Sequence, residues 1–138
     1  MKAAVCTRYG PPQVLQIQSV ERPPPKRGEV LVKVAATAVT SSDCFIRSGI
    51  PTAKPLARLL FRLFIGLRKP RRPILGLVLS GEIAAVGKHV SRFRAGDRVY
   101  AFTGFRFGAY GEYATLPESG IIATVPSNFA VEEAAAIP

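Results

Sequence analysis

Apolar residues recur along the first third of this chain in short runs that are typical of β-strands. Residues 2–6, 15–20 and 29–39 carry Ala, Val, Leu and Ile at their apolar positions, and side chains of this kind pack well on a pleated surface. The first two runs predict a hairpin-like pair, and Pro23-Pro24-Pro25 predicts an extended linker to the third. The run 29–39 is the longest of the three, so we expect it to be the central strand of a sheet.

The second half of the chain has the same β character, interrupted by glycines. We expect strands over residues 74–86, 98–102, 110–116 and 121–125, because apolar side chains dominate these runs and turn-forming residues separate them. Many short strands with turn residues between them favour a barrel or a sandwich. The pattern therefore predicts a mainly β fold with short helices.

Two short helices are predicted where small polar residues precede apolar or alanine-rich segments. Residues 40–43 read Thr-Ser-Ser-Asp, and such side chains accept hydrogen bonds from the free N–H groups of a helix start. We expect a helical turn over residues 43–47, capped by one of the last three of these side chains and ended by Gly49 and Pro51. Residues 127–138 combine a serine, two acids and a run of alanines, so a second helix should begin there.

A third helix is predicted over residues 56–67 by helical periodicity. Its apolar side chains recur three or four residues apart, at Leu56, Leu59, Leu60, Leu63, Phe64 and Leu67. Arg58 and Arg62 lie one turn apart on another face, which makes the helix amphipathic. Three interpretations remain open: a helix packed on the barrel, which we favour, a lid over a substrate site, or an anchor on a membrane surface.

The chain is strongly basic, but its excess charge is concentrated in one segment. Its 138 residues carry a formal net charge of +10. Most of this excess comes from cations with no acid between them: Lys54, Arg58, Arg62, Arg68, Lys69, Arg71 and Arg72. Binding along nucleic acid needs positive charge spread over a face together with elements that read a groove. We therefore expect no nucleic-acid partner, and favour a solvated basic segment over contact with an anionic cofactor, a phosphorylated substrate or a membrane surface.

The cysteine and hydropathy patterns bear on location. Cys6 and Cys44 are too few and too unpatterned for a disulfide framework, and no signal peptide precedes the first strand, which together predict a cytoplasmic location. The longest apolar run is broken by Arg62 and is shorter than the roughly 20 residues of a membrane-spanning helix. We expect Cys44 to be a small buried residue rather than a reactive thiol, and His89 to be an exposed turn residue.

Four ordered motifs in this chain are similar to those of a known superfamily. They are the glycine-rich run 76–87, the turn at residues 95–99, the Gly-Ala-Tyr-Gly-Glu-Tyr run at residues 108–113 and the terminal residues 132–138. In this order they resemble the amino-terminal half of the medium-chain dehydrogenases/reductases, and in particular their zinc-independent, quinone-oxidoreductase-like branch. The resemblance covers nearly all of the chain.

This resemblance implies a fold and a domain organisation. The first domain of the superfamily is a partly open β-barrel of the GroES-like type, and we expect it over residues 1–126, with a basic amphipathic helical insertion at 54–72. Residues 127–138 would begin the helix that leads to a Rossmann domain binding NADPH, so the chain is expected to be truncated before that domain. Because the end of the full-length chain returns to complete the first domain in this superfamily, a strand edge or apolar patch should lie uncovered here.

The resemblance also bears on metal binding. Zinc-dependent members place a Cys at the end of the central strand and a His-Glu pair in the glycine motif. The matching positions here hold Thr40, Leu77 and Val78. A hydroxyl and two aliphatic side chains do not form such a site, so we expect no zinc.

The candidate site residues follow from the same comparison. In the superfamily, the end of the central strand and the next helical turn face the nicotinamide and the substrate, and the matching residues are Thr40, Ser41, Asp43 and Phe45. Their role would be to orient the reactants and to stabilise developing charge, so no catalytic residue is assigned. Helix capping is the competing interpretation of the polar residues in this turn.

These implications give a leading hypothesis and an alternative. The leading one is the amino-terminal catalytic-domain fragment of a zinc-free, NADPH-dependent oxidoreductase, inactive alone, that transfers hydride to a small quinone or enone. A homodimer is one option for its assembly. The alternative is a stand-alone GroES-like binding or co-chaperone module. Whether the chain is itself an enzyme stays open at this stage.

Overall fold

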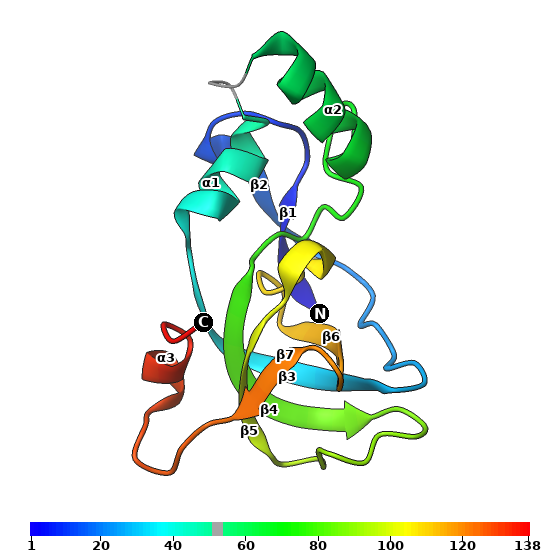
Figure 1. Ribbon diagram of the computed structural model, residues 1–138, viewed down its shortest axis with the longest axis vertical. Coiled ribbons are helices and arrows are strands. Elements are labelled where there is room, and N and C mark those ends of the chain that lie inside the picture. The colour runs from blue at the N-terminus through cyan, green and yellow to red at the C-terminus, as the bar shows by residue number, and fades with distance from the viewer. Residues whose placement is uncertain (51–53) are drawn as a thin grey trace.

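Two antiparallel sheets form the body of the molecule (Figure 1). The computed structural model describes residues 1–50 and 54–138. One sheet is the pair β1 (Lys2–Cys6) and β2 (Leu15–Ser19). The other has the strand order β6-β3-β4-β5-β7. Its strands are β3 (Glu29–Ala38), β4 (Val78–Val86), β5 (Arg98–Phe102), β6 (Tyr113–Pro117) and β7 (Ile121–Thr124).

The five-stranded sheet is curled because its two longest strands do not pair in perfect register. The β3–β4 ladder shifts between Leu31 and Val32 and again between Val34 and Ala36, and such irregularities bend a strand and increase its twist. At the bend, Gly81 lies so close to β3 that an added Cβ would collide with the carbonyl oxygen of Lys33. The result is the partly open, GroES-like half-barrel that the sequence predicts, mostly β with short helices.

The inside of the curl is filled by one apolar cluster, to which all five strands of this sheet contribute. Along β6, buried and half-buried residues alternate, as expected for a strand with one face on a core. The cluster comprises Val30, Val32, Leu79, Ile83, Phe93, Val99, Ala101, Ala109, Ala114, Leu116 and Ile122. We call this part of the molecule the sheet end.

The opposite end is built from helices and the two-stranded sheet. Figure 1 places α1 (Ser41–Ser48) and α2 (Pro55–Ile65) beside β1 and β2, away from most of the five-stranded sheet. With the short 3-10 helix η1 (Pro12–Val14), they enclose a second, smaller cluster. It comprises Cys6, Val14, Ile46, Ile65, Leu75, Leu77, Val78 and Phe107. We call this part the helical end.

A last short helix, α3 (Val131–Ala134), lies against the sheet near the end of the chain. The Ser80 hydroxyl donates a hydrogen bond to the carbonyl oxygen of Val131, which ties α3 to β4. The helix begins later than residue 127, because the N–H of Phe129 closes a turn onto Pro126 first.

Several strand predictions need correction. The run 29–39 does form an interior strand, but β4 rather than β3 occupies the middle of the sheet. Residues 74–77 do not extend β4, since Ile74 makes only an isolated bridge with Val5. Likewise β6 begins at Tyr113, because the residues before it turn rather than pair in the ladder.

The prediction for the third helix is half right. An α-helix is present at Pro55–Ile65, but it packs through Phe61 and Ile65, whereas Leu60, Leu63 and the rest of the predicted apolar stripe are exposed. The stripe therefore does not bind the helix to the barrel. Across the described part of the chain, no helix is long and apolar enough to cross a membrane.

Candidate functional site

The polar turn at the end of β3 is a helix cap. Thr40 is the N-cap of α1, and its hydroxyl accepts a hydrogen bond from the N–H of Asp43 at 3.3 Å. In return, the Asp43 carboxylate accepts from the Thr40 N–H at 2.9 Å and from the Thr40 hydroxyl at 2.8 Å. Two free donors of the helix start are satisfied in this way. Capping is thus correct, but Thr40 is the cap and Asp43 completes the box, while Ser41 and Ser42 do neither.

Asp43 also faces a tyrosine across the interior. Its side chain is only 3% exposed, and its Oδ1 atom has no hydrogen-bond partner within the described residues, nor has the hydroxyl of Tyr110. Burial and the negative charge of Asp43 raise the pKa of Tyr110 far above its usual range. The raised pKa thus reflects the cost of placing a second negative charge in this buried space beside Asp43.

Next to this turn lies a pocket of about 400 Å³. Four phenylalanines line it, one each from α1, α2, the end of β5 and η2 (Gly104–Arg106). Among the residues that the structure describes, its lining comprises Ser42, Phe45, Ile46, Ile50, Phe61, Leu77, Phe102, Gly104 and Phe105, and Ser42 is the one polar side chain in this set. We call it the aromatic pocket. Its chemistry suits a flat, apolar molecule with a polar atom at one edge.

The structure places the four candidate residues differently. Phe45 is half exposed and lines the aromatic pocket. Thr40 and Asp43 lie behind it in the capping box, and the hydroxyl proton of Thr40 is donated to Asp43. Ser41 is exposed and lines none of the pockets described.

Three further aromatic residues of the pocket were not identified from sequence. Phe61 lies on the face of α2 opposite the predicted apolar stripe. Phe102 is the last residue of β5, where only a strand was predicted, and Phe105 lies in η2, which was not predicted. The one available signal was the density of phenylalanine between residues 102 and 107.

The positions that hold zinc in related enzymes do not suit a metal here. Leu77 and Val78 are buried and apolar, and Thr40 is engaged in the helix cap. Among residues 1–50 and 54–138, no group of three His, Cys, Asp or Glu side chains is placed to hold a metal ion. His89 is an exposed turn residue, as predicted. Cys44 is exposed, so the prediction of a buried residue is wrong.

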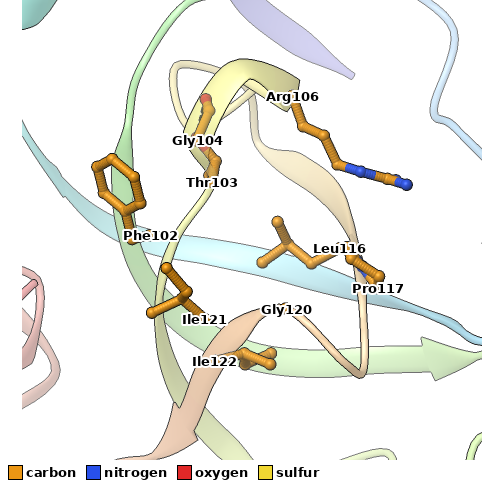
Figure 2. Close-up of a pocket in the computed structure, with 9 residues that line it drawn as sticks. All are labelled: Phe102, Thr103, Gly104, Arg106, Leu116, Pro117, Gly120, Ile121 and Ile122. Carbon is orange, nitrogen blue, oxygen red and sulfur yellow. Dashed lines mark hydrogen bonds between the residues drawn. The ribbon is translucent and has the colours of Figure 1, made fainter.

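A second hollow, of about 250 Å³, opens between β5, β6 and β7 (Figure 2). Arg106 extends from η2 toward Leu116 and Pro117 and forms an ion pair with Glu29 at 2.7 Å. Although partial burial acts to raise it, the hydrogen bond from Arg106 and the one from the Lys26 N–H lower the pKa of Glu29. The cation of this hollow is therefore already neutralised.

An apolar groove runs between β2 and the last part of β3. β6 pairs with β3 only from Glu29 to Lys33. The Val34 N–H still donates to the carbonyl oxygen of Glu112 at 2.9 Å, and the β6 ladder does not continue along β3 beyond this point. Ile17 and Val39, both 72% exposed, lie along this groove. This matches the expectation of an uncovered strand edge and apolar patch.

Comparison with known proteins gives consistent matches. The family described as "Alcohol dehydrogenase GroES-like domain" matches residues 26–127. Quinone oxidoreductase from Sus scrofa is 37% identical over 138 residues, which cover 99% of this chain and 37% of that protein. Human quinone oxidoreductase is 34% identical with the same coverage. The chain thus spans little more than a third of the length of these relatives.

Solved structures agree with this picture. The quinone oxidoreductase from Coxiella burnetii superimposes with a TM-score of 0.82 at 26% identity, covering all of this chain and 41% of that one. The Escherichia coli quinone oxidoreductase complexed with NADPH gives 0.78 at 26% identity, covering 99% of this chain and 37% of that one.

Proposed function

Because this chain belongs to the alcohol dehydrogenase GroES-like domain family, we propose that it is the substrate-binding domain of a zinc-free, NADPH-dependent quinone or enone reductase. Residues 1–126 would form this domain, with 54–72 as its insertion. Residues 127–138 would begin the connection to a nucleotide-binding domain. The chain covers 37% of the Sus scrofa relative and 41% of the Coxiella burnetii structure, as expected for one domain of a longer protein, and this supports the division.

The aromatic pocket is the observation that carries the proposal. A quinone is flat and apolar, with oxygen atoms at its rim, and aromatic rings pack against such a molecule face to face or edge to face. Phe45, Phe61, Phe102 and Phe105 supply four rings around one opening, next to the turn that ends β3. Pockets of this kind, apolar with few polar groups, are typical of small-molecule sites.

In this proposal the residues of the chain bind the substrate and orient it. The four rings exclude water and hold the ring of the substrate. The Ser42 hydroxyl, exposed and without a hydrogen bond within the described residues, would donate to a substrate oxygen on which negative charge develops. Thr40 and Asp43 would hold α1 in place, and so position Phe45 and Ser42. Ser41 is the candidate that the geometry supports least.

The cofactor proposal rests on relatives. NADPH is the hydride donor that we propose, and structures titled as NADPH complexes of the Escherichia coli enzyme and of mycobacterial Rv1454c are similar to this chain. A dinucleotide site needs a glycine-rich turn between a strand and a helix, whereas the glycines of residues 76–87 lie within or beside β4. We therefore propose that the chain alone does not turn over substrate. The co-chaperone alternative is not favoured.

Titration of the chain with 1,4-naphthoquinone, followed by NMR, tests the pocket. We expect saturable shifts of the pocket residues, and Phe45→Ala should weaken binding by about tenfold because it removes one stacking partner. Phe129→Ala is the matched control, since Phe129 is partly exposed but lines none of the pockets described. Equal weakening by both variants would contradict the proposal.

Two further measurements separate the remaining parts of the proposal. NADPH oxidation by the purified chain in the presence of the quinone would show that it is active alone. A ring-shaped oligomer by native mass spectrometry would favour the co-chaperone alternative instead.

A further inference from the structure

The outer face of α2 is an exposed apolar surface. Each of its side chains keeps about half or more of its area accessible, and Leu56 reaches 68%. At 3.6 residues per turn, Leu56, Leu60 and Leu63 lie roughly opposite Phe61 and Ile65, through which the helix packs. The face comprises Leu56, Leu59, Leu60, Leu63, Phe64 and Leu67, and Phe105 extends it, since its ring meets that of Phe64 edge to face at 5.5 Å.

Specific contacts hold the helix with this face outward. The Tyr9 hydroxyl donates to the carbonyl oxygen of Gly66 at 2.7 Å, and the Arg71 N–H donates to that of Ile65 at 2.7 Å. The guanidinium of Arg71 also donates to the carbonyl oxygen of Leu63 at 3.1 Å. Together with the inward packing of Phe61 and Ile65, these contacts fix the orientation of α2, so its apolar face points outward.

The charged residues of the segment that contains this face are all cations. No acid occurs between Asp43 and Glu82 in the sequence. Lys54, Arg58, Arg68 and Lys69 are exposed, and the one ion pair within the described residues lies elsewhere, between Arg106 and Glu29. Lys54 at the start of α2 and Lys69 after its end therefore lie near the apolar face without an ion pair to any described residue, whereas Arg58, seven residues before Ile65, lies on the packed side of the helix.

We propose that α2 and residues 66–72 bind the surface of an anionic lipid bilayer. A helix with one apolar face and nearby cations lies in the plane of the interface, with its apolar side chains at the acyl boundary and its cations among anionic headgroups. The eleven residues of α2 are too few to span a bilayer, so the contact is peripheral. This inference is independent of the proposed reductase activity.

Other occupants fit the surface less well. Two copies of the chain that met through this face would bring two groups of unneutralised cations together, which opposes association. A nucleic acid would attract the cations but would leave the apolar side chains in water. An anionic bilayer satisfies both the charge and the apolar area.

Co-sedimentation of the chain with vesicles tests the proposal. Vesicles of phosphatidylcholine mixed with phosphatidylserine should pellet the chain, vesicles of phosphatidylcholine alone should do so far less, and added salt should reduce the pelleted fraction. Absence of pelleting, or equal pelleting with both vesicles, would overturn the proposal. So would a concentration-dependent dimer in vesicle-free solution that Leu60→Gln with Phe64→Gln abolishes, because the face would then serve a second copy.

Two double variants test whether membrane binding depends on this face or on exposed apolar residues in general. Leu60→Gln with Phe64→Gln should lower the partition coefficient at least about tenfold. Ile17→Gln with Ile121→Gln, at sites of similar exposure outside this face, should leave it unchanged. All four side chains are exposed, so each double variant should keep the fold. Equal loss in both would contradict the proposal.

A second pair tests the charge. Lys54→Gln with Lys69→Gln, at exposed cations near the two ends of α2, should lower the partition coefficient by roughly fivefold per charge removed. Arg27→Gln with Lys88→Gln removes as much net charge from exposed sites outside the basic segment. If this control lowers binding equally, net charge alone explains the attraction and the proposed site is wrong.

Discussion

The two ends of the molecule treat apolar side chains in opposite ways. At the sheet end, Leu79, Ile83 and Val99 are fully buried inside the curled sheet. At the helical end, Leu60 and Phe64 keep more than half of their area exposed, and four phenylalanines line an open pocket. Apolar area that stays in water does not stabilise a fold. Both ends bury an apolar cluster, but the larger one is at the sheet end, which should therefore contribute more of the stability, while the helical end also exposes apolar surface.

The sharpest test of this contrast exchanges the same residue type at both ends. Leu79→Ala should lower the free energy of unfolding by about 3 kcal/mol, because it leaves a cavity in a closed core. Leu63→Ala removes the same atoms from the outer face of α2 and should cost no more than about 0.5 kcal/mol. Urea denaturation measures both. Similar losses for the two variants would break the comparison.

Gly81 tests how tightly the sheet end is built. Gly81→Ala adds a Cβ against the backbone of β3, so the two strands must shift apart, and we expect a loss of about 2 kcal/mol. Gly28 is the control: its φ is 71° and nothing lies within 4 Å of an added Cβ. Gly28→Ala should therefore show only the cost of a left-handed conformation, about 1 kcal/mol. A smaller loss at Gly81 than at Gly28 would argue against the close approach.

The cap of α1 should have an intermediate effect. Thr40→Ala removes one acceptor and one donor of the capping box, and we expect thermal denaturation to report a loss of about 1 kcal/mol. Thr40→Ser keeps the hydroxyl and should restore most of the stability. Thr124→Ala, on exposed β7, is the matched control and should be nearly neutral.

The Glu29–Arg106 pair joins the start of β3 to η2 and should have the smallest effect. Glu29 has a lowered pKa in the folded state, so its contribution is present above its ordinary pKa of about 4.3 and is lost as the pH falls through the lowered value. Arg106→Gln should cost less than about 1 kcal/mol near pH 7, since the arginine is partly exposed.

The pH dependence provides the check on this pair. The difference in unfolding free energy between Arg106→Gln and the unchanged chain should shrink as the pH falls below about 4. Arg94→Gln should show no such trend, because the Arg94 side chain is exposed and forms no ion pair among the described residues; only its backbone N–H contacts a carboxylate, that of Asp97. A difference that is constant with pH would exclude the ion pair as its cause.

The positions of several strands along the chain were predictable because they depend on local residue patterns. Alternating apolar residues and intervening turns locate β1, β5 and β7 closely. The predicted start of β4 was wrong because strand pairing decides it. Residues 74–77 have a strand-like composition, but Ile74 makes only an isolated bridge with Val5. Similarly, the middle place of β4 depends on long-range pairing that a single run of residues does not reveal.

The candidate site was predictable only in part, for a different reason. Periodicity finds an apolar stripe on α2 but does not tell which face packs. The structure instead packs the helix through the buried Ile65 and the partly buried Phe61. The capping residues Thr40 and Asp43 follow a sequence pattern that local chemistry explains. Phe102 and Phe105 join the pocket through tertiary packing, which no local pattern contains. The domain boundaries and the roles of the four candidate residues stay predictions.

The pairing of Ala38 with Val78 has a consequence for how this chain can vary. The segment between these two residues includes α1 and α2, and it connects β3 to β4, which pair directly with each other. For a flexible loop, the entropy lost on closure grows only with the logarithm of length, so doubling it costs about 0.6 kcal/mol. A change in the length of the segment that joins β3 to β4 should therefore cost the pairing of these two strands little. Evolution or protein engineering can therefore change which molecules this connecting segment binds without changing the strands of the barrel.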